Sequence, residues 1–150
     1  MDIDGTVTVR AAVLEDLRRI RLLHEQLYPE HGPTDEHVAA EAWRVIAATP
    51  GRSIYVGEVG GVVVGTVDET VMANLAHRGQ PYLLVENVVV DHDHRRHGVG
   101  AALLGAAEAV GRAAGCYKLQ LSADDSTAFA FYEAAGWEHT ARTYKRYLDG

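Results

Sequence analysis

The chain has 150 residues, of which 47% are hydrophobic and 23% charged, and its formal net charge is −7 at pH 7. This length and composition are typical of one globular domain, and we predict a single domain over residues 1–150. The one cysteine, Cys116, excludes an intrachain disulfide and a thiolate cage for zinc. The negative charge disfavours nucleic acid as a partner, because the phosphate backbone is also negative.

Apolar runs are short throughout the sequence and stay far below the roughly 20 residues that span a bilayer. The N-terminal segment MDIDGTVTVR also lacks the positively charged start and apolar stretch of a secretory signal. We therefore expect no membrane partner and a cytoplasmic location.

The first third of the chain is predicted to hold a short strand followed by two helices. Residues 6–10 alternate between valine and polar side chains, as in a strand. The next segment ends near Pro29, and its apolar positions have helical spacing: Val13, Leu17, Ile20, His24 and Leu27. Thr34 and Asp35 can cap a second helix that ends at Pro50, with an expected apolar face of Val38, Ala42, Val45 and Ile46.

Three β-rich runs follow and predict an antiparallel meander over residues 53–59, 62–72 and 82–90. Gly60-Gly61 supplies the positive φ of a tight hairpin between the first two. The third run is apolar at nearly every position, so we expect it to be buried on both faces. Glu86 and Asn87 interrupt it, and unpaired polar groups there cost on the order of 1–3 kcal/mol each, so they need partners or a function.

The last third predicts a helix over residues 99–114 that Gly115 ends, a strand over 116–121, a helix over 127–135 and a final β segment over 137–147. The order of elements indicates an α+β fold with one central, mixed and mostly antiparallel sheet and about four helices.

The turn between the third strand and the following helix has the sequence DHDHRRHGVGA over residues 91–101. Amides at a helix start lack intrahelical acceptors and carry partial positive charge, so they favour an anion such as a pyrophosphate. Gly98 and Gly100 permit close approach, while Arg95 and Arg96 add positive charge. A turn that only connects the strand tightly to the helix, without binding an anion, has the same sequence pattern. A Rossmann site is disfavoured, because Ala101 is misplaced for its third glycine and the strands form a meander.

Two motifs resemble the GNAT acetyltransferases, which use acetyl-CoA: Arg95-x-x-Gly98-x-Gly100 after a buried strand, and Phe131-Tyr132-Glu133-x-x-Gly136-Trp137. The resemblance covers essentially the whole chain. Within the family, residues 85–90 and 115–118 are most similar to the branch of glucosamine-6-phosphate N-acetyltransferases. The resemblance to the GNAT family implies a three-layer α/β/α fold whose sheet is splayed at the cofactor site, and one acetyl-CoA-binding domain over residues 1–150.

The same resemblance implies where acetyl-CoA binds. The amides of residues 96–101 would hold the pyrophosphate, and the pantetheine arm would pair with the backbone of Val88 and Val90. Asp125 stands where many relatives have asparagine, which makes it a less comfortable neighbour for an anionic cofactor. The expected cofactor-binding residues are Val88, Val89, Val90, Arg95, Arg96, His97, Gly98, Val99, Gly100, Ala101, Asp125 and Tyr132.

The expected catalytic residues are Glu86, Asn87, Val88 and Tyr132. Glu86 would take the proton of the attacking amine, directly or through water, and the Asn87 carbonyl would orient that amine. The resemblance also implies that the Val88 N–H would stabilise the oxyanion and that Tyr132 would protonate the departing thiolate. Two alternatives stay open: Glu86 as a sheet residue paired with an arginine, and Tyr132 as a packed core aromatic. Many relatives place the base two residues earlier, where this chain has Leu84.

These features predict an N-acetyltransferase that moves acetyl from acetyl-CoA directly to a primary amine of a small molecule. The alternatives are an acyl-CoA-binding sensor or regulatory module without catalysis, and a plain nucleotide-binding protein. No metal is expected, since the histidines beside the turn, His92, His94 and His97, are more often solvent-facing than ligands. Family habit suggests a homodimer, with the C-terminal strand as one way to form it.

Overall fold

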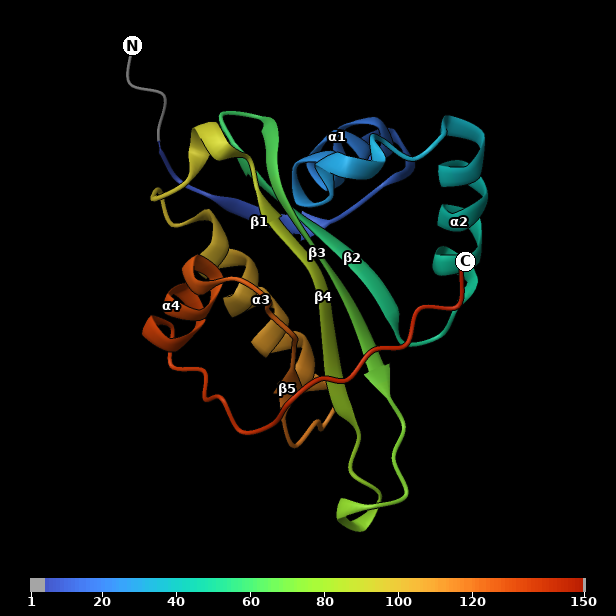
Figure 1. The fold of residues 1–150 in the computed structure, drawn as a ribbon, viewed down its shortest axis with the longest axis vertical. Coiled ribbons are helices and arrows are strands. Elements are labelled where there is room, and N and C mark those ends of the chain that lie inside the picture. Colours follow the sequence, from blue (N-terminus) through green and yellow to red (C-terminus); the bar gives the residue numbers. More distant parts are fainter. Residues whose placement is uncertain (1–4, 150) are drawn as a thin grey trace. The chain divides into compact units, whose positions relative to one another are not determined.

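The computed structural model describes residues 5–149 and divides into two compact units that meet in sequence between Gln120 and Leu121. The first unit contains a sheet and three α-helices, drawn in Figure 1: β1 (Thr8–Ala11), α1 (Leu17–Leu27), α2 (Glu36–Ala48), β2 (Arg52–Val59), β3 (Val62–Met72), β4 (Tyr82–Val90), α3 (Val99–Ala113) and β5 (Leu119–Gln120). The second unit contains α4 (Ser126–Ala134). No helix in the described residues is long and apolar enough to cross a bilayer.

The sheet has the strand order β1-β2-β3-β4-β5, and every neighbouring pair is antiparallel except β4 and β5, which are parallel. The predicted meander and its hairpin at Gly60-Gly61 are confirmed, and both glycines have positive φ. β4 and β5 pair only at Leu83↔Leu119 and Leu84↔Gln120. Beyond these two positions the edge of β4 has no partner strand within the described part of the first unit, so the sheet is open there.

Helices α1 and α3 cover opposite faces of the sheet, which gives the three predicted layers (Figure 1). On the α1 face the buried core consists of Ile20, Leu23, Val56, Val63 and Val89. On the α3 face Val99 packs so closely on the sheet that a Cβ on Gly65 would lie 2.8 Å from its Cγ1 atom. Glycine at this position therefore sets the distance between helix and sheet.

Helix α2 does not bury the face that its spacing predicts. Val38 and Val45 are 59% and 53% exposed, whereas the neighbouring Ala39 is buried. The more buried stripe is Ala39, Trp43 and Ile46, and α2 packs against α1 and β2. Apolar residues flank this stripe on both sides, so the spacing fixes the helix but not the face that turns inward.

The structure also corrects two predicted strands. The strand over residues 116–121 is reduced to two residues, because the amide of Cys116 still bonds to Gly111 O at 2.9 Å and completes the end of α3. Residues 137–147 form no strand, and the side chains of Tyr144 and Tyr147 are exposed. A strand needs a hydrogen-bonded neighbour. The described residues of the second unit include no other strand that could provide one.

Candidate active site

A β-bulge in β4 shapes the region where the sequence analysis placed Glu86 and Asn87. The pairing with β3 passes from Asp68↔Glu86 to Thr66↔Val89, so β4 carries one extra residue over this interval. Asn87 adopts a φ of +50°, a left-handed conformation that asparagine accepts more readily than most residues. Bulges of this kind turn side chains away from simple alternation and are common beside active sites.

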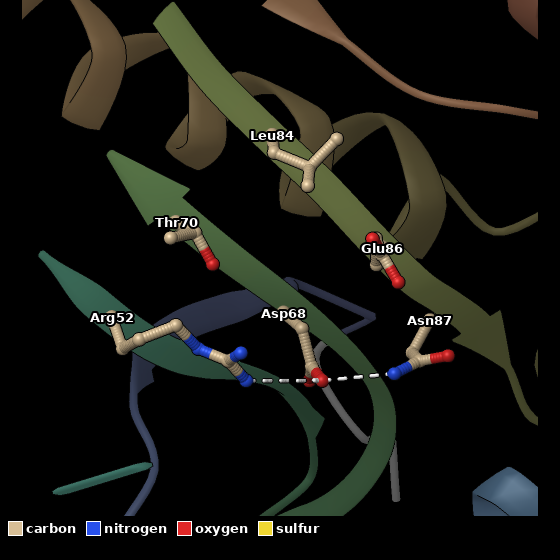
Figure 2. A pocket seen from close by; sticks show the side chains of 6 residues that line it. All are labelled: Arg52, Asp68, Thr70, Leu84, Glu86 and Asn87. Atoms are coloured by element: carbon tan, nitrogen blue, oxygen red, sulfur yellow. Dashed lines mark hydrogen bonds and ion pairs between the residues drawn. The ribbon is translucent and has the colours of Figure 1, made fainter. Parts of the chain in front are cut away.

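The Asn87 side chain points to Asp68 on β3, as Figure 2 shows. Asn87 Nδ2 donates a hydrogen bond of 2.9 Å to Asp68 Oδ2, and Arg52 Nη2 lies 3.9 Å from the same oxygen. The other carboxylate oxygen, Oδ1, is buried without a hydrogen-bond partner in the described structure. Burial raises the pKa of Asp68, while the Asn87 hydrogen bond and the charges of His24 and Arg52 oppose that rise.

These side chains line a pocket of about 120 Å³ on three adjacent strands, with walls formed by Arg52, Asp68, Thr70, Leu84, Glu86 and Asn87 (Figure 2). The Glu86 side chain is exposed and makes no hydrogen bond or ion pair within the described residues, while its backbone pairs with Asp68. The arginine of the pocket, Arg52, forms an ion pair with Asp68 at 3.9 Å, which is too long for a direct hydrogen bond. The pocket therefore offers a free carboxylate in Glu86 and a partly satisfied one in Asp68.

The bulge also decides which backbone groups of β4 face the open edge of the sheet. Leu83 donates its N–H to Lys118 O, on the β5 side, whereas Asp91 donates its N–H to Val64 O, on the β3 side. By alternation from Asp91, the N–H and C=O groups of Val88 and Val90 point away from β3 and toward the open edge. The side chain of Arg95 reaches the same edge, where its Nε donates to Val90 O at 3.4 Å.

The turn after β4 is fixed to α1 through Asp91, which is buried. Its carboxylate accepts hydrogen bonds from Arg19 Nη2 at 2.7 Å and from Gln26 Nε2 at 3.2 Å. Burial alone would raise the pKa of Asp91, but the bonds from Gln26, the Asp93 amide and Arg19 lower it, so the group is held as a carboxylate. These contacts give the following residues a fixed starting point.

Beyond Asp91 the turn is exposed and then enters α3. Arg95, Arg96 and His97 are exposed, and Gly98 forms the N-cap with a φ of +80°. Ala102 donates its N–H to Gly98 O, so the three amides before it, on residues 99–101, have no acceptor inside the helix. A Cβ built on Gly98 would meet nothing within 4 Å, so the space beside the helix start is open. Free amides, open space and two arginines fit a bound diphosphate.

Three side chains of this turn, Asp91, His92 and Asp93, place ligand atoms within 4.8 Å of one another. His92 and Asp93 are exposed, and the Asp91 carboxylate is already occupied by Arg19 and Gln26. The contacts of Asp91 with Arg19 and Gln26 explain the cluster as a structural one that stabilises the turn.

In the second unit, Tyr132 lies on α4 within an aromatic group. Its ring makes edge contacts with Phe131 and Trp137, at centroid distances of 5.1 and 5.9 Å. Burial, and then the charge of Asp125, raise the pKa of Tyr132, so the phenol stays protonated at neutral pH. Asp125 itself is the N-cap of α4 and accepts the Ala128 N–H at 2.8 Å, which gives it a structural role.

Sequence reasoning missed Asp68 and Arg52. A signal for Asp68 was present, since two acids stand side by side at positions 68 and 69 within a β-rich run, just as Glu86 and Asn87 interrupt the next one. Arg52 gave no such signal, because an arginine at the start of a strand is unremarkable in sequence.

Comparison with known proteins agrees with this architecture. Residues 17–137 match the model of the Acetyltransferase (GNAT) family. The chain belongs to this family. The match contains β4, the turn, α3 and the Tyr132 segment, so both motifs of the sequence analysis lie within it.

Solved structures with the same fold include other GNAT acetyltransferases. A protein from Agrobacterium tumefaciens str. C58, provisionally described as an acetyltransferase, is 28% identical, covers 94% of this chain and 99% of its own, and has a TM-score of 0.89. A transcriptional regulator from Bacillus halodurans C-125 has the same TM-score at 23% identity, with coverages of 95% and 100%. Glucosamine-6-phosphate N-acetyltransferase from Arabidopsis thaliana has a TM-score of 0.81 at 20% identity, with coverages of 96% and 99%.

Proposed function

We propose that this acetyltransferase is an N-acetyltransferase that transfers acetyl from acetyl-CoA directly to a primary amine of a small molecule. The observation that carries the proposal is the bulge in β4. Just before the bulge, Glu86 pairs with Asp68 and lines the same pocket, and the extra residue turns the Val88 amide to the open edge of the sheet. A proton acceptor and an oxyanion donor therefore stand on one rigid strand.

In this proposal the CoA diphosphate is held by the free amides at the start of α3 and by Arg95 and Arg96. The open edge offers the backbone groups of Val88 and the N–H of Val90 to the pantetheine arm, while Val90 O accepts from Arg95. When bound, acetyl-CoA supplies an acetyl thioester that an amine can attack. A cytoplasmic location and a homodimer belong to the same proposal, and light scattering of the purified protein tests the dimer.

The residues of the pocket then handle the amine and its proton. Glu86 accepts the amine proton, directly or through water, because it has no competing partner. Asn87 donates through Nδ2 to Asp68. Its own amide oxygen, Asn87 Oδ1, is therefore free to accept a hydrogen bond from the amine and orient it. The Val88 N–H donates to the acetyl oxygen as charge develops there, an effect worth about 3–4 kcal/mol in comparable sites. The nitrogen bonds to the acetyl carbon as the carbon–sulfur bond breaks, and the departing sulfur takes up a proton. Tyr132, which is protonated at neutral pH, is the proposed donor, and proton exchange with water then restores the phenol and the Glu86 carboxylate.

The direct test measures free thiol released from acetyl-CoA in the presence of a panel of primary amines. Glu86→Gln removes the proton acceptor with little change in shape and is expected to lower kcat by about 10²- to 10⁴-fold. Glu36→Gln serves as the matched control, because Glu36 is exposed on α2, outside the pocket and both motifs. Activity that survives Glu86→Gln unchanged would exclude Glu86 as the base.

A second candidate function is an acyl-CoA-binding sensor or regulatory module without catalysis. It is favoured by one observation, the close fold match to a protein described as a transcriptional regulator. Calorimetry separates the two candidates. Binding of acetyl-CoA without thiol release for any amine supports the sensor, and absence of binding contradicts both.

A further inference from the structure

We infer that the pocket around Asp68 selects an acceptor with an anionic oxygen group a few bonds from its amine: Asp68 holds the amine and Arg52 holds the anionic group. This inference deepens the proposed function and rests on it, because it assigns the acceptor class to the same pocket.

The first argument is that two polar atoms of opposite kind are left unmatched in one small space. Asp68 Oδ1 is an acceptor without a partner, and Arg52 Nε is a donor without a partner, and both are buried. Buried polar groups in folded proteins are nearly always hydrogen-bonded, so an unmatched donor and an unmatched acceptor in a pocket are expected to gain partners there. A ligand with one donor and one acceptor group complements the two side chains that carry these atoms.

The second argument is that these two residues do not satisfy each other. Arg52 Nη2 and Asp68 Oδ2 are 3.9 Å apart, which is longer than the 2.7–3.2 Å of a direct hydrogen bond. Asn87 holds Oδ2 at 2.9 Å (Figure 2), and Oδ1 is left without a hydrogen-bond partner within the described structure. The guanidinium keeps several of its five donors for another acceptor.

The third argument concerns charge. The lining residues include two carboxylates, Asp68 and Glu86, and one guanidinium, Arg52. His24 on α1 also interacts electrostatically with Asp68, but its burial lowers its pKa and favours the neutral ring. An ammonium is attracted by the carboxylates and an anionic oxygen by the guanidinium, preferably through two parallel hydrogen bonds. A ligand with both groups complements the whole pocket, whereas a simple alkylamine leaves Arg52 unused.

The fourth argument is size. The pocket is small, at about 120 Å³, and within it Arg52 Nη2 and Asp68 Oδ2 lie only 3.9 Å apart. The amine and the anionic group must therefore be close together within the ligand, as in a short amino acid or an aminoalkyl phosphate.

The test compares β-alanine, 2-aminoethyl phosphate and propylamine, which share a primary amine on a short chain. Thiol release at saturating acetyl-CoA gives kcat/KM for each amine, and calorimetry with the CoA-saturated protein gives the affinity for each probe. We expect at least one anionic amine to exceed propylamine by about tenfold or more, mainly through KM. The carboxylate and phosphate probes identify which anionic group Arg52 prefers.

Two variants assign this preference to the pocket. Arg52→Gln is expected to abolish the ratio between the anionic amine and propylamine, and Asp68→Asn to weaken binding of all three probes. Arg44→Gln is the control, since Arg44 is exposed on α2 and paired with Glu41. Equal values for all three probes, or a ratio that survives Arg52→Gln, would overturn the inference while leaving an active acetyltransferase. Selective, Arg52-dependent binding without any thiol release would instead overturn the proposed function and support the selectivity of the pocket.

Discussion

Glu69 gives the most quantitative test of how this sheet is built. It follows Asp68 on β3, so the two side chains point to opposite faces, and Glu69 is 0% exposed. Neither of its carboxylate oxygens has a hydrogen-bond partner within the described structure. Burial, and then the negative charge of Asp68, raise the pKa of Glu69 from 4.5 to about 7. A buried carboxyl with this pKa destabilises the folded protein whenever it must ionise.

The size of the effect follows from the two pKa values. The unfolded chain loses this proton near pH 4.5 and the folded chain near pH 7, so the folded state binds more protons between them. Stability therefore falls as pH rises through this interval and stays low above it. Each pKa unit corresponds to 1.36 kcal/mol, so the loss of folding stability caused by Glu69 is about 1 kcal/mol at pH 5 and about 3 kcal/mol at pH 8.

Glu69→Gln removes the titration and keeps the size of the side chain. The amide carries its own cost of burial, but that cost does not change with pH. We therefore expect the free energy of unfolding of the variant, relative to the unchanged protein, to rise by about 2.5 kcal/mol between pH 5 and pH 8. Urea unfolding at both pH values measures this difference, with exposed Glu133→Gln as control. A difference that is the same at pH 5 and pH 8 would refute the argument.

Three further substitutions test other parts of the structure. Arg19→Gln leaves the Asp91 carboxylate buried without its cation and should lower the free energy of unfolding by about 1–3 kcal/mol in urea at pH 7. Because the pKa of Asp91 is lowered in the folded protein, this loss of stability should shrink as the carboxyl protonates in acid. A loss of stability that does not change with pH would contradict the argument. Gly65→Ala forces a Cβ to 2.8 Å from Val99 and should cost about 1–3 kcal/mol, so an unchanged midpoint would show that α3 moves freely. Tyr132→Phe should lower kcat in the thiol-release assay while the affinity for acetyl-CoA in calorimetry changes little; equal kcat would assign Tyr132 to packing alone.

The meander could be predicted from sequence because its signals are local. Gly60-Gly61 fixes the hairpin, and the bounds of β3 and β4 match their apolar runs. The C-terminal segment has a similar alternation over residues 137–147, yet it forms no strand. Alternation describes one strand, whereas a strand exists only with a neighbour, and the sequence of one segment does not show whether that neighbour is present.

The pocket could be predicted only in part, for a related reason. Glu86 and Asn87 stood out because they interrupt an apolar run, and the structure places both in the pocket. Asp68 and Glu69 are an equally unusual pair, but a pair of adjacent strand residues always divides between two faces. Whether Asp68 or Glu69 lies on the same face as Glu86 depends on the register of β3 against β4. The pairing Asp68↔Glu86 is part of the tertiary structure and is not visible in the sequence of either strand.

The bulge at Asn87 is the feature on which both halves of the proposed site depend. Before the bulge, the N–H of Leu83 points to β5, so the odd-numbered amides of β4 face β5 and the even-numbered amides face β3. After the bulge, the N–H of Asp91 points to β3, so the odd-numbered amides face β3 and the even-numbered amides face the open edge. In a regular strand, Glu86 and Val88 would therefore have their backbone groups on the same side, and the Val88 N–H would be consumed by β3. The extra residue frees that amide for the open edge while Glu86 still faces the pocket with Asp68. A left-handed φ at a non-glycine residue has an energetic cost, and here it allows one strand to serve the pocket and the open edge together.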